Sequence, residues 1–457
     1  MTAPESQHTA NSQIVTSGPI IRTIVALALP VTLGMLMEVT LNITDFYWVG
    51  KLGSAAQDAV ASSMVIIWTV YSAVSVISIG VTALVSRYIG AGDPDRAIHY
   101  IKQALYLSLI IGAVFTAAGY MLTPASMDFM EAGEPTQAQA IPYLRIFFVV
   151  SILLFLIETV YAVFRASGDT KTPTKVGITV VCINLVLDPV LIFGVGPIPA
   201  MGVPGAAVAT ALAHLYGVVV ISRYLLKGKL GYHVGRLWGS LPQLASMLKI
   251  ARIGLPIASQ QLVFVVVYWF LIKYVHEFGE AAGAAMGIGN RMESISYLTC
   301  YGISIAASTM VGQNLGAGNP GRAAKCAWGS TGLGIGVTLV LSAIFIGAPG
   351  LLASVFTDDP AVKAIAVDYL IILGLSQTAM AIEIILEGAF SGAGNTIPPM
   401  TILVPGSLAR VPLAYYLAFE LGWGINGIWW TLTITSVLKS VLLALWFWRG
   451  RWKLKKL

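Results

Sequence analysis

Charged residues are scarce in this sequence. Only 11% of its 457 residues are Asp, Glu, Lys or Arg, whereas 57% are hydrophobic, and the mean hydropathy is +0.81. A soluble globular chain carries about 25% charged residues, so this composition excludes a soluble domain. Cysteine is scarce too, and three residues provide no disulfide framework. The composition predicts a helical membrane protein, because a membrane barrel would show alternating segments of about ten residues.

Long stretches without charge separate the few charged residues. Those from Asp58 to Arg87 and from Lys325 to Asp358 exceed the roughly 20 residues that cross a bilayer. Breaks at loop residues predict twelve transmembrane helices, at residues 20–49, 55–85, 97–123, 138–165, 174–196, 202–226, 247–275, 281–312, 322–347, 364–392, 398–419 and 424–449. The expected fold class is therefore an all-α polytopic membrane protein with 12 transmembrane helices.

The positions of Lys and Arg predict the orientation. With a cytoplasmic amino terminus, most of the 27 Lys and Arg residues fall on the cytoplasmic side, as the positive-inside rule requires. Residues 1–19 are polar, and no basic region precedes the first apolar run, so we expect no cleaved signal peptide. We expect a plasma (inner) membrane protein with both termini in the cytoplasm. Its net charge of +6 then reflects topology and contact with membrane lipids, and nucleic-acid binding has no support.

The two halves of the chain repeat each other with an offset of 226 residues. Three sets of residues recur: Leu29-Pro30 as Leu255-Pro256, Gly90-Ala-Gly-Asp-Pro-Asp-Arg-Ala97 as Gly316-Ala-Gly-Asn-Pro-Gly-Arg-Ala323, and Phe164, Gly168, Thr170 and Pro173 as Phe390, Gly394, Thr396 and Pro399. Since six spans separate equivalent positions, the halves are parallel repeats. This predicts an amino-terminal lobe at 20–226 and a carboxy-terminal lobe at 247–449, joined by a cytoplasmic linker at 227–246, with cytoplasmic tails at 1–19 and 450–457.

The repeated loop motifs resemble those of the multidrug and toxic compound extrusion (MATE) family. They are the Gly90–Ala97 and Gly316–Ala323 motifs, Phe164-Arg-Ala-Ser-Gly-Asp-Thr-Lys-Thr-Pro173, and Gly388-Ala-Phe-Ser-Gly-Ala-Gly-Asn-Thr396. The resemblance implies a monomeric transporter that exchanges Na⁺ or H⁺ for small organic, often cationic, compounds by alternating access. Lipid-linked saccharide flippases share this architecture and are the nearest alternative. A duplicated structural scaffold and a passive channel are two further alternatives.

Seven acidic residues fall within predicted spans, where each costs roughly 2.5–3.5 kcal/mol at a helix centre. They are Glu38, Asp45, Glu158, Asp188, Glu293, Glu383 and Glu387. The repeat does not duplicate three of those in the first lobe. Phe264 and Leu271 stand where Glu38 and Asp45 would recur, and Val411-Pro412 corresponds to Asp188-Pro189 after a slip of three residues. Shared scaffold would tend to be kept in both lobes. The asymmetry therefore predicts a coupling-ion site in the first lobe.

The spacing of polar residues gives this site a geometry. Glu38, Asn42 and Asp45 share one face of a helix, and Asn184 and Asp188 share another. Pro189 would free a backbone carbonyl, and Pro30 would provide a hinge in the first span. The carboxylate and amide oxygen atoms of these residues, together with the freed carbonyl, suit Na⁺ or a shared proton. The MATE resemblance implies a cation site formed by Asp45, Asn184, Asp188 and Thr210. Alternatively, the two aspartates cap or pair with other helices.

The second lobe departs from the family pattern. Other MATE members carry essential acids in spans 7 and 10, whereas here no acid occurs from Ile253 to Ile272. Glu383 and Glu387 in span 10 share a helix face, where they can contact substrate or pair with Arg291 or Arg410. Aromatic residues such as Trp68 and Tyr71 can stack on a cationic compound, or simply pack. The sequence contains no Walker loop, HExxH motif or recognisable Ser-His-Asp set, so we do not expect an enzyme, nor any cofactor besides the coupling ion.

Overall fold

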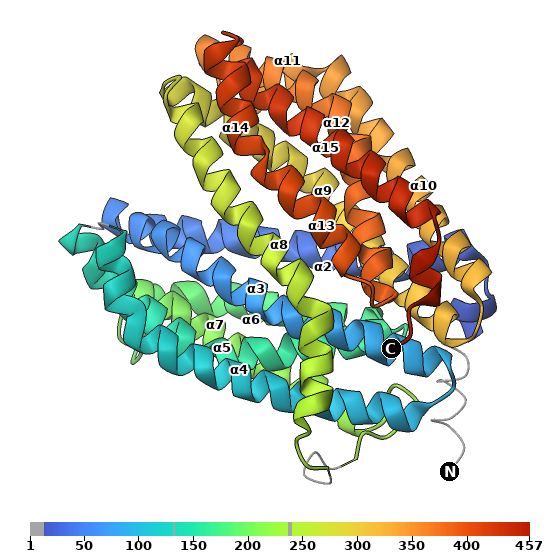
Figure 1. The fold of residues 1–457 in the computed structure, drawn as a ribbon. Coiled ribbons are helices and arrows are strands. Elements are labelled where there is room, and N and C mark those ends of the chain that lie inside the picture. The colour runs from blue at the N-terminus through green and yellow to red at the C-terminus, as the bar shows by residue number, and fades with distance from the viewer. Residues whose placement is uncertain (1–12, 131–132, 236–239) are drawn as a thin grey trace. The chain divides into compact units, whose positions relative to one another are not determined.

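The computed structural model describes residues 13–130, 133–235 and 240–457. Its membrane-length helices are α2 (Ile20–Gly50), α3 (Ser54–Gly90), α4 (Pro94–Phe129), α5 (Glu134–Ala166), α6 (Lys171–Phe193), α7 (Val203–Leu226), α8 (Leu244–His276), α9 (Glu280–Gly316), α10 (Pro320–Gly347), α12 (Pro360–Gly392), an interrupted helix over Ile397–Glu420, and α15 (Ile425–Trp448) (Figure 1). All twelve are long and apolar enough to cross a membrane. The twelve predicted spans are therefore confirmed.

The interrupted helix consists of α13 (Ile397–Leu408), α14 (Arg410–Tyr415) and a π-helical turn, η2 (Tyr416–Glu420). Pro412 has no N–H for the carbonyl of Leu408, which is the residue at which α13 ends. Two further short elements are α11 (Pro349–Ser354) and the 3₁₀-helix η3 (Arg451–Leu454).

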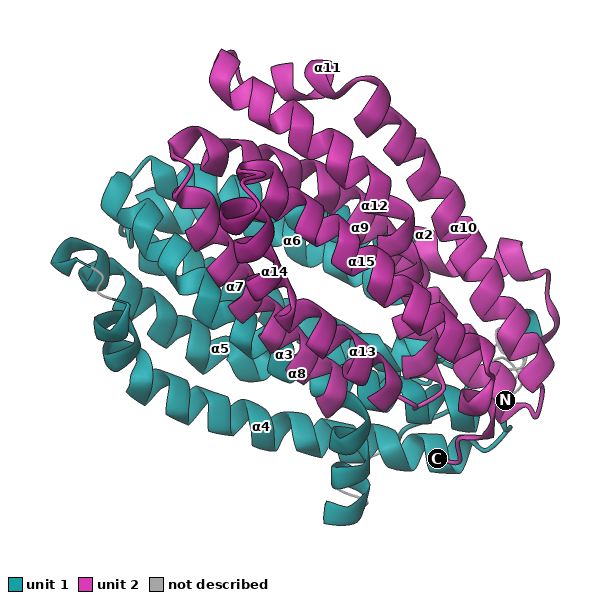
Figure 2. Cartoon of the chain, turned by 45° about the horizontal axis from the view of Figure 1, so that its top comes forward, with its two compact units in different colours: residues 1–14, 30–254 teal, residues 15–29, 255–457 magenta. Residues whose placement is uncertain are grey.

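The chain divides into two compact units, coloured separately in Figure 2. Within the described residues, unit 1 comprises Pro30–Gly254 together with the residues before 15, and unit 2 comprises Val15–Leu29 and Leu255–Leu457. Two helices pass from one unit to the other: α2 does so at Pro30, and α8 next to Pro256. These prolines are equivalent positions of the repeat. The first part of each helix thus belongs to the unit opposite to the lobe that the repeat predicts.

Within each unit, small residues let the helices pack closely. In unit 2, α12 packs on α9, α10 and α15. A Cβ atom added at Gly388 or Gly392 would overlap the backbone carbonyl of Ser304 or Ser308 on α9, as in the small-xxx-small contacts of membrane helices. In unit 1, α5 packs on α3, α4 and α7, and α6 on α7.

The repeated loop motifs form the turns between α3 and α4 and between α9 and α10. Gly92 and Gly318 have φ angles of 69° and 72°, a conformation that glycine adopts without strain. Asp93 then caps α4 by accepting a hydrogen bond from the backbone N–H of Arg96 at 3.0 Å. These residues therefore define tight turns and the start of the next helix.

The linker folds against unit 1. Gln103 on α4 donates to the carbonyl of Leu241 at 3.0 Å and accepts from the N–H of Gln243 at 2.7 Å. Tyr232 is buried and its hydroxyl lies 2.8 Å from Ser167 Oγ. Burial raises the pKa of Tyr232 above its usual range, so the phenol remains protonated and able to donate.

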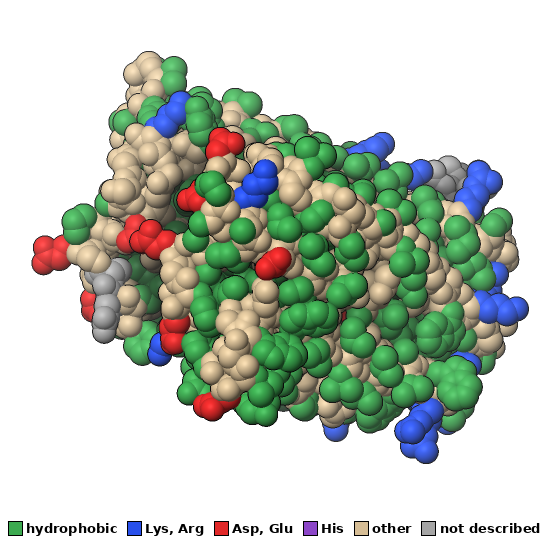
Figure 3. Space-filling model, turned by 90° about the horizontal axis from the view of Figure 1, so that it is seen from above, with side chains coloured by type: hydrophobic (Ala, Val, Ile, Leu, Met, Phe, Trp, Pro, Cys, Tyr) green, Lys and Arg blue, Asp and Glu red, His purple; other side chains and the backbone are tan. Residues whose placement is uncertain are grey.

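Hydrophobic side chains cover most of the face shown in Figure 3, and the charged side chains lie mainly at its margins. Large apolar residues on the outer helices are strongly exposed, among them Phe129 (89%) and Met121 (78%). Exposed apolar area of this extent is expected where lipid takes the place of water.

Candidate functional site

Two aspartates meet inside unit 1. The carboxyl groups of Asp45 on α2 and Asp188 on α6 lie next to each other and interact directly. We call these two residues the aspartate pair. Asp188 is fully buried and Asp45 is half-buried. The contact brings together residues 143 positions apart in sequence, each about five residues from the same end of its helix. Such a pair repels itself unless a proton or another cation joins it.

An amide links the aspartate pair to α7. Asn184 Nδ2 donates to Asp188 Oδ1 and to Thr210 Oγ1, both at 3.3 Å. The four residues that the family resemblance implies therefore come together in one place. Three buried oxygen atoms there, Asp45 Oδ1, Asn184 Oδ1 and Asp188 Oδ2, have no hydrogen-bond partner among the described residues. Unpaired buried acceptors of this kind fit a cation better than they fit the protein alone.

Sequence reasoning missed Tyr143 on α5. Its phenol interacts electrostatically with both Asp45 and Asp188, and its ring packs against a small apolar cluster that contains Val49. Nothing in the spacing of this tyrosine marks it out, because its partners lie on two other helices. Only the tertiary packing brings it to the pair.

Glu38 and Asn42 share the face of α2 that carries Asp45, but they do not have the same neighbours. Glu38 interacts electrostatically with Glu158 and Arg165 on α5, and Asn42 is exposed. Arg165 Nη2 lies 3.4 Å from Glu158 Oε2. Glu158 and Arg165 lie on one face of α5, but their i, i+7 spacing is not that of a helical ion pair, so no pairing of the two was expected from the sequence.

The acids of α12 have separate partners in unit 2. Lys439 on α15 donates to Glu383 Oε1 at 2.7 Å, and Gln260 on α8 donates to Glu387 Oε2 at 3.2 Å. Arg410, one of the two partners considered from sequence, instead donates to the hydroxyl groups of Thr435 and Ser436 on α15. It still interacts electrostatically with Glu383. Arg291, the second partner considered from sequence, is exposed.

Two aromatic residues of α3 are accessible. Trp68 is 51% exposed and Tyr71 is 38% exposed. Tyr71 interacts electrostatically with Glu38 and Glu158, so an aromatic ring and carboxylates face the same region of unit 1. Aromatic faces beside acids suit an organic cation.

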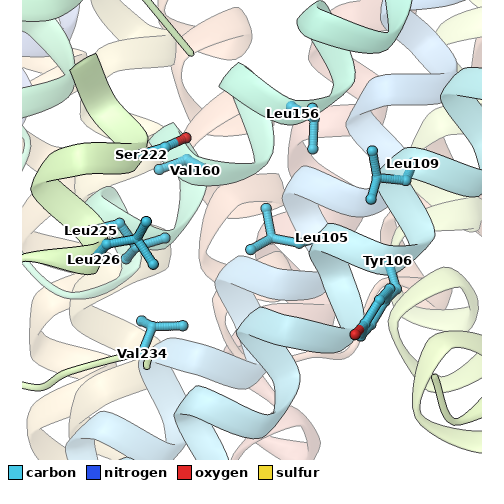
Figure 4. Close-up of a pocket in the computed structure, with 9 residues that line it drawn as sticks. All are labelled: Leu105, Tyr106, Leu109, Leu156, Val160, Ser222, Leu225, Leu226 and Val234. Atoms are coloured by element: carbon cyan, nitrogen blue, oxygen red, sulfur yellow. The ribbon is translucent and has the colours of Figure 1, made fainter. Parts of the chain in front are cut away.

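An apolar cavity of about 200 Å³ lies elsewhere in unit 1, between α4, α5, α7 and the linker (Figure 4). Leu105, Leu109, Leu156 and Val160 contribute to its lining, which contains no acidic or basic residue. The Tyr106 hydroxyl at its edge donates to the carbonyl of Ser240 at 3.0 Å. This cavity can accommodate an apolar chain, but it has no group that would hold an ion.

A repeated set of twelve membrane-length helices with ionisable groups buried inside each unit is typical of a secondary transporter. The model of the MatE family matches residues 30–190 and again residues 256–416. The second match begins and ends 226 residues after the first, the offset found in the sequence, and the two cover more than half of the chain. The chain belongs to the MatE family.

Several named relatives and solved structures are similar over nearly the whole chain. The probable multidrug resistance protein NorM of Thermotoga maritima is 28% identical over 436 residues, covering 94% of this chain and 92% of its own. The FAD transporter of Shewanella oneidensis is 27% identical over 435 residues, covering 93% and 94%. The solved outward-facing conformation of a multidrug resistance MATE family transporter of the MOP superfamily has a TM-score of 0.90 at 22% identity, covering 98% and 99%. This last likeness concerns the fold.

Proposed function

We propose that this protein is a secondary active multidrug exporter, which moves organic, often cationic, compounds outward while Na⁺ or H⁺ moves inward. The observation that carries the proposal is the buried contact between Asp45 and Asp188, with three oxygen atoms that lack protein donors. The names of two relatives, a probable multidrug resistance protein and an FAD transporter, support transport of organic compounds.

The aspartate pair supplies the charge for coupling. A Na⁺ ion can be held there by the carboxylates together with the oxygen atoms of Asn184 and Thr210, and a proton can be shared between the carboxylates. Either cation removes the repulsion between two buried negative charges. Loading and unloading of the pair therefore changes the electrostatic energy of the whole of unit 1, which is the requirement for driving a conformational change.

The membrane potential limits the stoichiometry. One elementary charge crossing 100 mV gains about 2.3 kcal/mol, enough for a roughly 40-fold gradient. Exchange of one monovalent organic cation for one H⁺ moves no net charge and cannot use this potential. Either two ions enter for each cation exported, or the substrate is neutral, or the ion's concentration gradient drives the exchange.

Substrate contacts are proposed for Trp68 and Tyr71 in unit 1 and for Glu383 and Glu387 in unit 2. Because Lys439 already neutralises Glu383, Glu387 is the acid of α12 better suited to an organic cation. The same ion pair argues against a lipid-linked saccharide flippase, whose pyrophosphate needs uncompensated basic groups. Export of FAD is a second candidate, favoured by the Shewanella relative.

We further propose a monomer in the plasma membrane, with both termini in the cytoplasm, in contact with lipid and with small organic molecules. Alkaline phosphatase fused to the carboxy terminus should then be inactive in cells, since this reporter folds only outside the cytoplasm. An active fusion would contradict this orientation and place the carboxy terminus outside the cytoplasm.

The function is tested in vesicles containing the purified protein. A fluorescent organic cation is loaded inside, and either a Na⁺ gradient or a pH gradient is imposed, with FAD tested in parallel. We expect efflux to depend on one of the two gradients and to lose that dependence in Asp45→Asn and Asp188→Asn. Coupled efflux that is unchanged in both variants would remove the aspartate pair from the mechanism, and hydrolysis of ATP by the protein would contradict secondary transport.

A further inference from the structure

A second polar cluster lies in unit 1, apart from the aspartate pair. It contains Glu38 on α2 and Glu158, Tyr161 and Arg165 on α5. Arg165 Nη2 lies 3.4 Å from Glu158 Oε2 and 3.5 Å from Ser78 Oγ, and Glu38 interacts electrostatically with Glu158 and Arg165. When both carboxylates are ionised, the single guanidinium leaves one negative charge unbalanced. The cluster thus has the charge to take up one monovalent cation.

The hydroxyl of Tyr161 indicates that this cluster binds a ligand from outside the protein. Tyr161 is only 9% exposed, and its hydroxyl oxygen has no hydrogen-bond partner among the described residues. It interacts electrostatically with Glu158, Arg165 and Glu38. A buried hydroxyl without a partner is unfavourable. A cation, bare or with a water molecule, would satisfy this oxygen and balance the charge of the cluster.

Polar groups lead from the aspartate pair toward this cluster. Glu38 precedes Asp45 by seven residues, which is about 10 Å along a helix. Helix α7 runs in the same direction from Thr210 to His214, whose Nδ1–H donates to the carbonyl of Thr210 at 2.8 Å. Because a carbonyl only accepts, the neutral ring keeps Nε2 as an acceptor. His214 also interacts electrostatically with Glu158.

The repeat indicates that the cluster is not shared scaffold. The positions 226 residues after Glu38, Glu158, Tyr161 and Arg165 hold Phe264, Ile384, Glu387 and Ser391. Neither the ion pair nor the tyrosine therefore recurs in the second half. Like the aspartate pair, the cluster belongs to the first half alone, which is expected if the two act on the same ion.

We propose that Glu38, Glu158 and Tyr161 form a transit site for the coupling cation, between the aspartate pair and the cytoplasmic end of unit 1. The cation leaves the pair, is held by the two carboxylates and the tyrosine hydroxyl, and passes into the cytoplasm. The fixed charge of Arg165 keeps this site from retaining the ion. The inference rests on the proposed function and on the proposed orientation of α2.

The test separates binding at the aspartate pair from passage through the transit site. Cation binding to the purified protein is measured at equilibrium, with radioactive Na⁺ or by proton release, and coupled efflux is measured in vesicles. For Glu38→Gln and Glu158→Gln we expect efflux at least about tenfold slower, with retained binding at the pair. Asp45→Asn is expected to lose both. Glu158→Asp should recover part of the rate, and Glu134→Gln, at the exposed opposite end of α5, should leave it unchanged.

A purely structural role of the ion pair gives a different result. Removing both charges in Glu158→Gln/Arg165→Gln would then restore transport, because no unpaired guanidinium is left. Our proposal expects this double variant to remain slow. Restored efflux in it, or efflux within about twofold of wild type in both Glu38→Gln and Tyr161→Phe, which disturb no ion pair, overturns the transit site. Whether the aspartate pair binds the coupling cation is decided separately, by the equilibrium binding measured for Asp45→Asn.

Discussion

Lys439 donates a hydrogen bond to Glu383 across 2.7 Å, with only 4% and 16% of the two side chains exposed. Removing one partner of a buried ion pair leaves the other charge uncompensated, at a cost of about 3–5 kcal/mol. Lys439→Met should therefore lower the midpoint of thermal unfolding in detergent markedly. The double variant Lys439→Met/Glu383→Gln should regain most of the loss. Equal destabilisation of the single and double variants would contradict a charge effect.

The hydroxyl of Thr210 accepts a hydrogen bond from Asn184 beside the aspartate pair. Thr210→Val keeps the shape of the side chain but removes this oxygen, and the lost hydrogen bond is worth about 0.5–1.5 kcal/mol. We expect a roughly two- to tenfold weaker apparent affinity for the coupling cation, measured as the half-saturating Na⁺ or H⁺ concentration for efflux. Thr210→Ser retains the hydroxyl and should behave like wild type. A fully active valine variant would take Thr210 out of the site.

The chain passes from one unit to the other at Pro30 on α2 and next to Pro256 on α8. A proline inside a helix removes one backbone hydrogen bond and favours bending. If the bends serve alternating access, Pro30→Ala should slow coupled efflux while equilibrium cation binding is retained. Pro256→Ala, at the equivalent position of the repeat, is expected to act in the same direction. Unaltered transport in Pro30→Ala would eliminate bending of α2 as the link between ion and substrate.

Close packing of α12 on α9 depends on Gly392. An added methyl group would overlap the backbone carbonyl of Ser308, and overpacking of this kind costs about 1–3 kcal/mol. Gly392→Ala should therefore lower the unfolding temperature in detergent. Gly332→Ala on α10 is the matched control, because a methyl group there meets no atom within 4 Å. If both variants lowered the unfolding temperature equally, the close contact between Gly392 and Ser308 would not be the reason for the destabilisation.

The sequence by itself determined the class of protein and its layout. Twelve apolar runs require twelve helices, because a backbone in lipid must satisfy its own hydrogen bonds, and the 226-residue offset revealed the repeat that the family match reproduces. It also pointed to Asp45 and Asp188, since neither recurs in the second half. Composition and periodicity act along the chain, so features of this kind can be recognised without coordinates.

Only the tertiary structure decided which polar groups meet. Helical spacing placed Glu38 and Asp45 on one face of α2, but packing gives Asp45 the partner Asp188 and gives Glu38 the partners Glu158 and Arg165. Packing also gives Glu383 the partner Lys439, which the sequence did not suggest. Electrostatic and hydrogen-bond energies depend on distances of a few ångströms between helices. Those distances follow from how small residues let the helices approach, and no spacing within a single helix contains them.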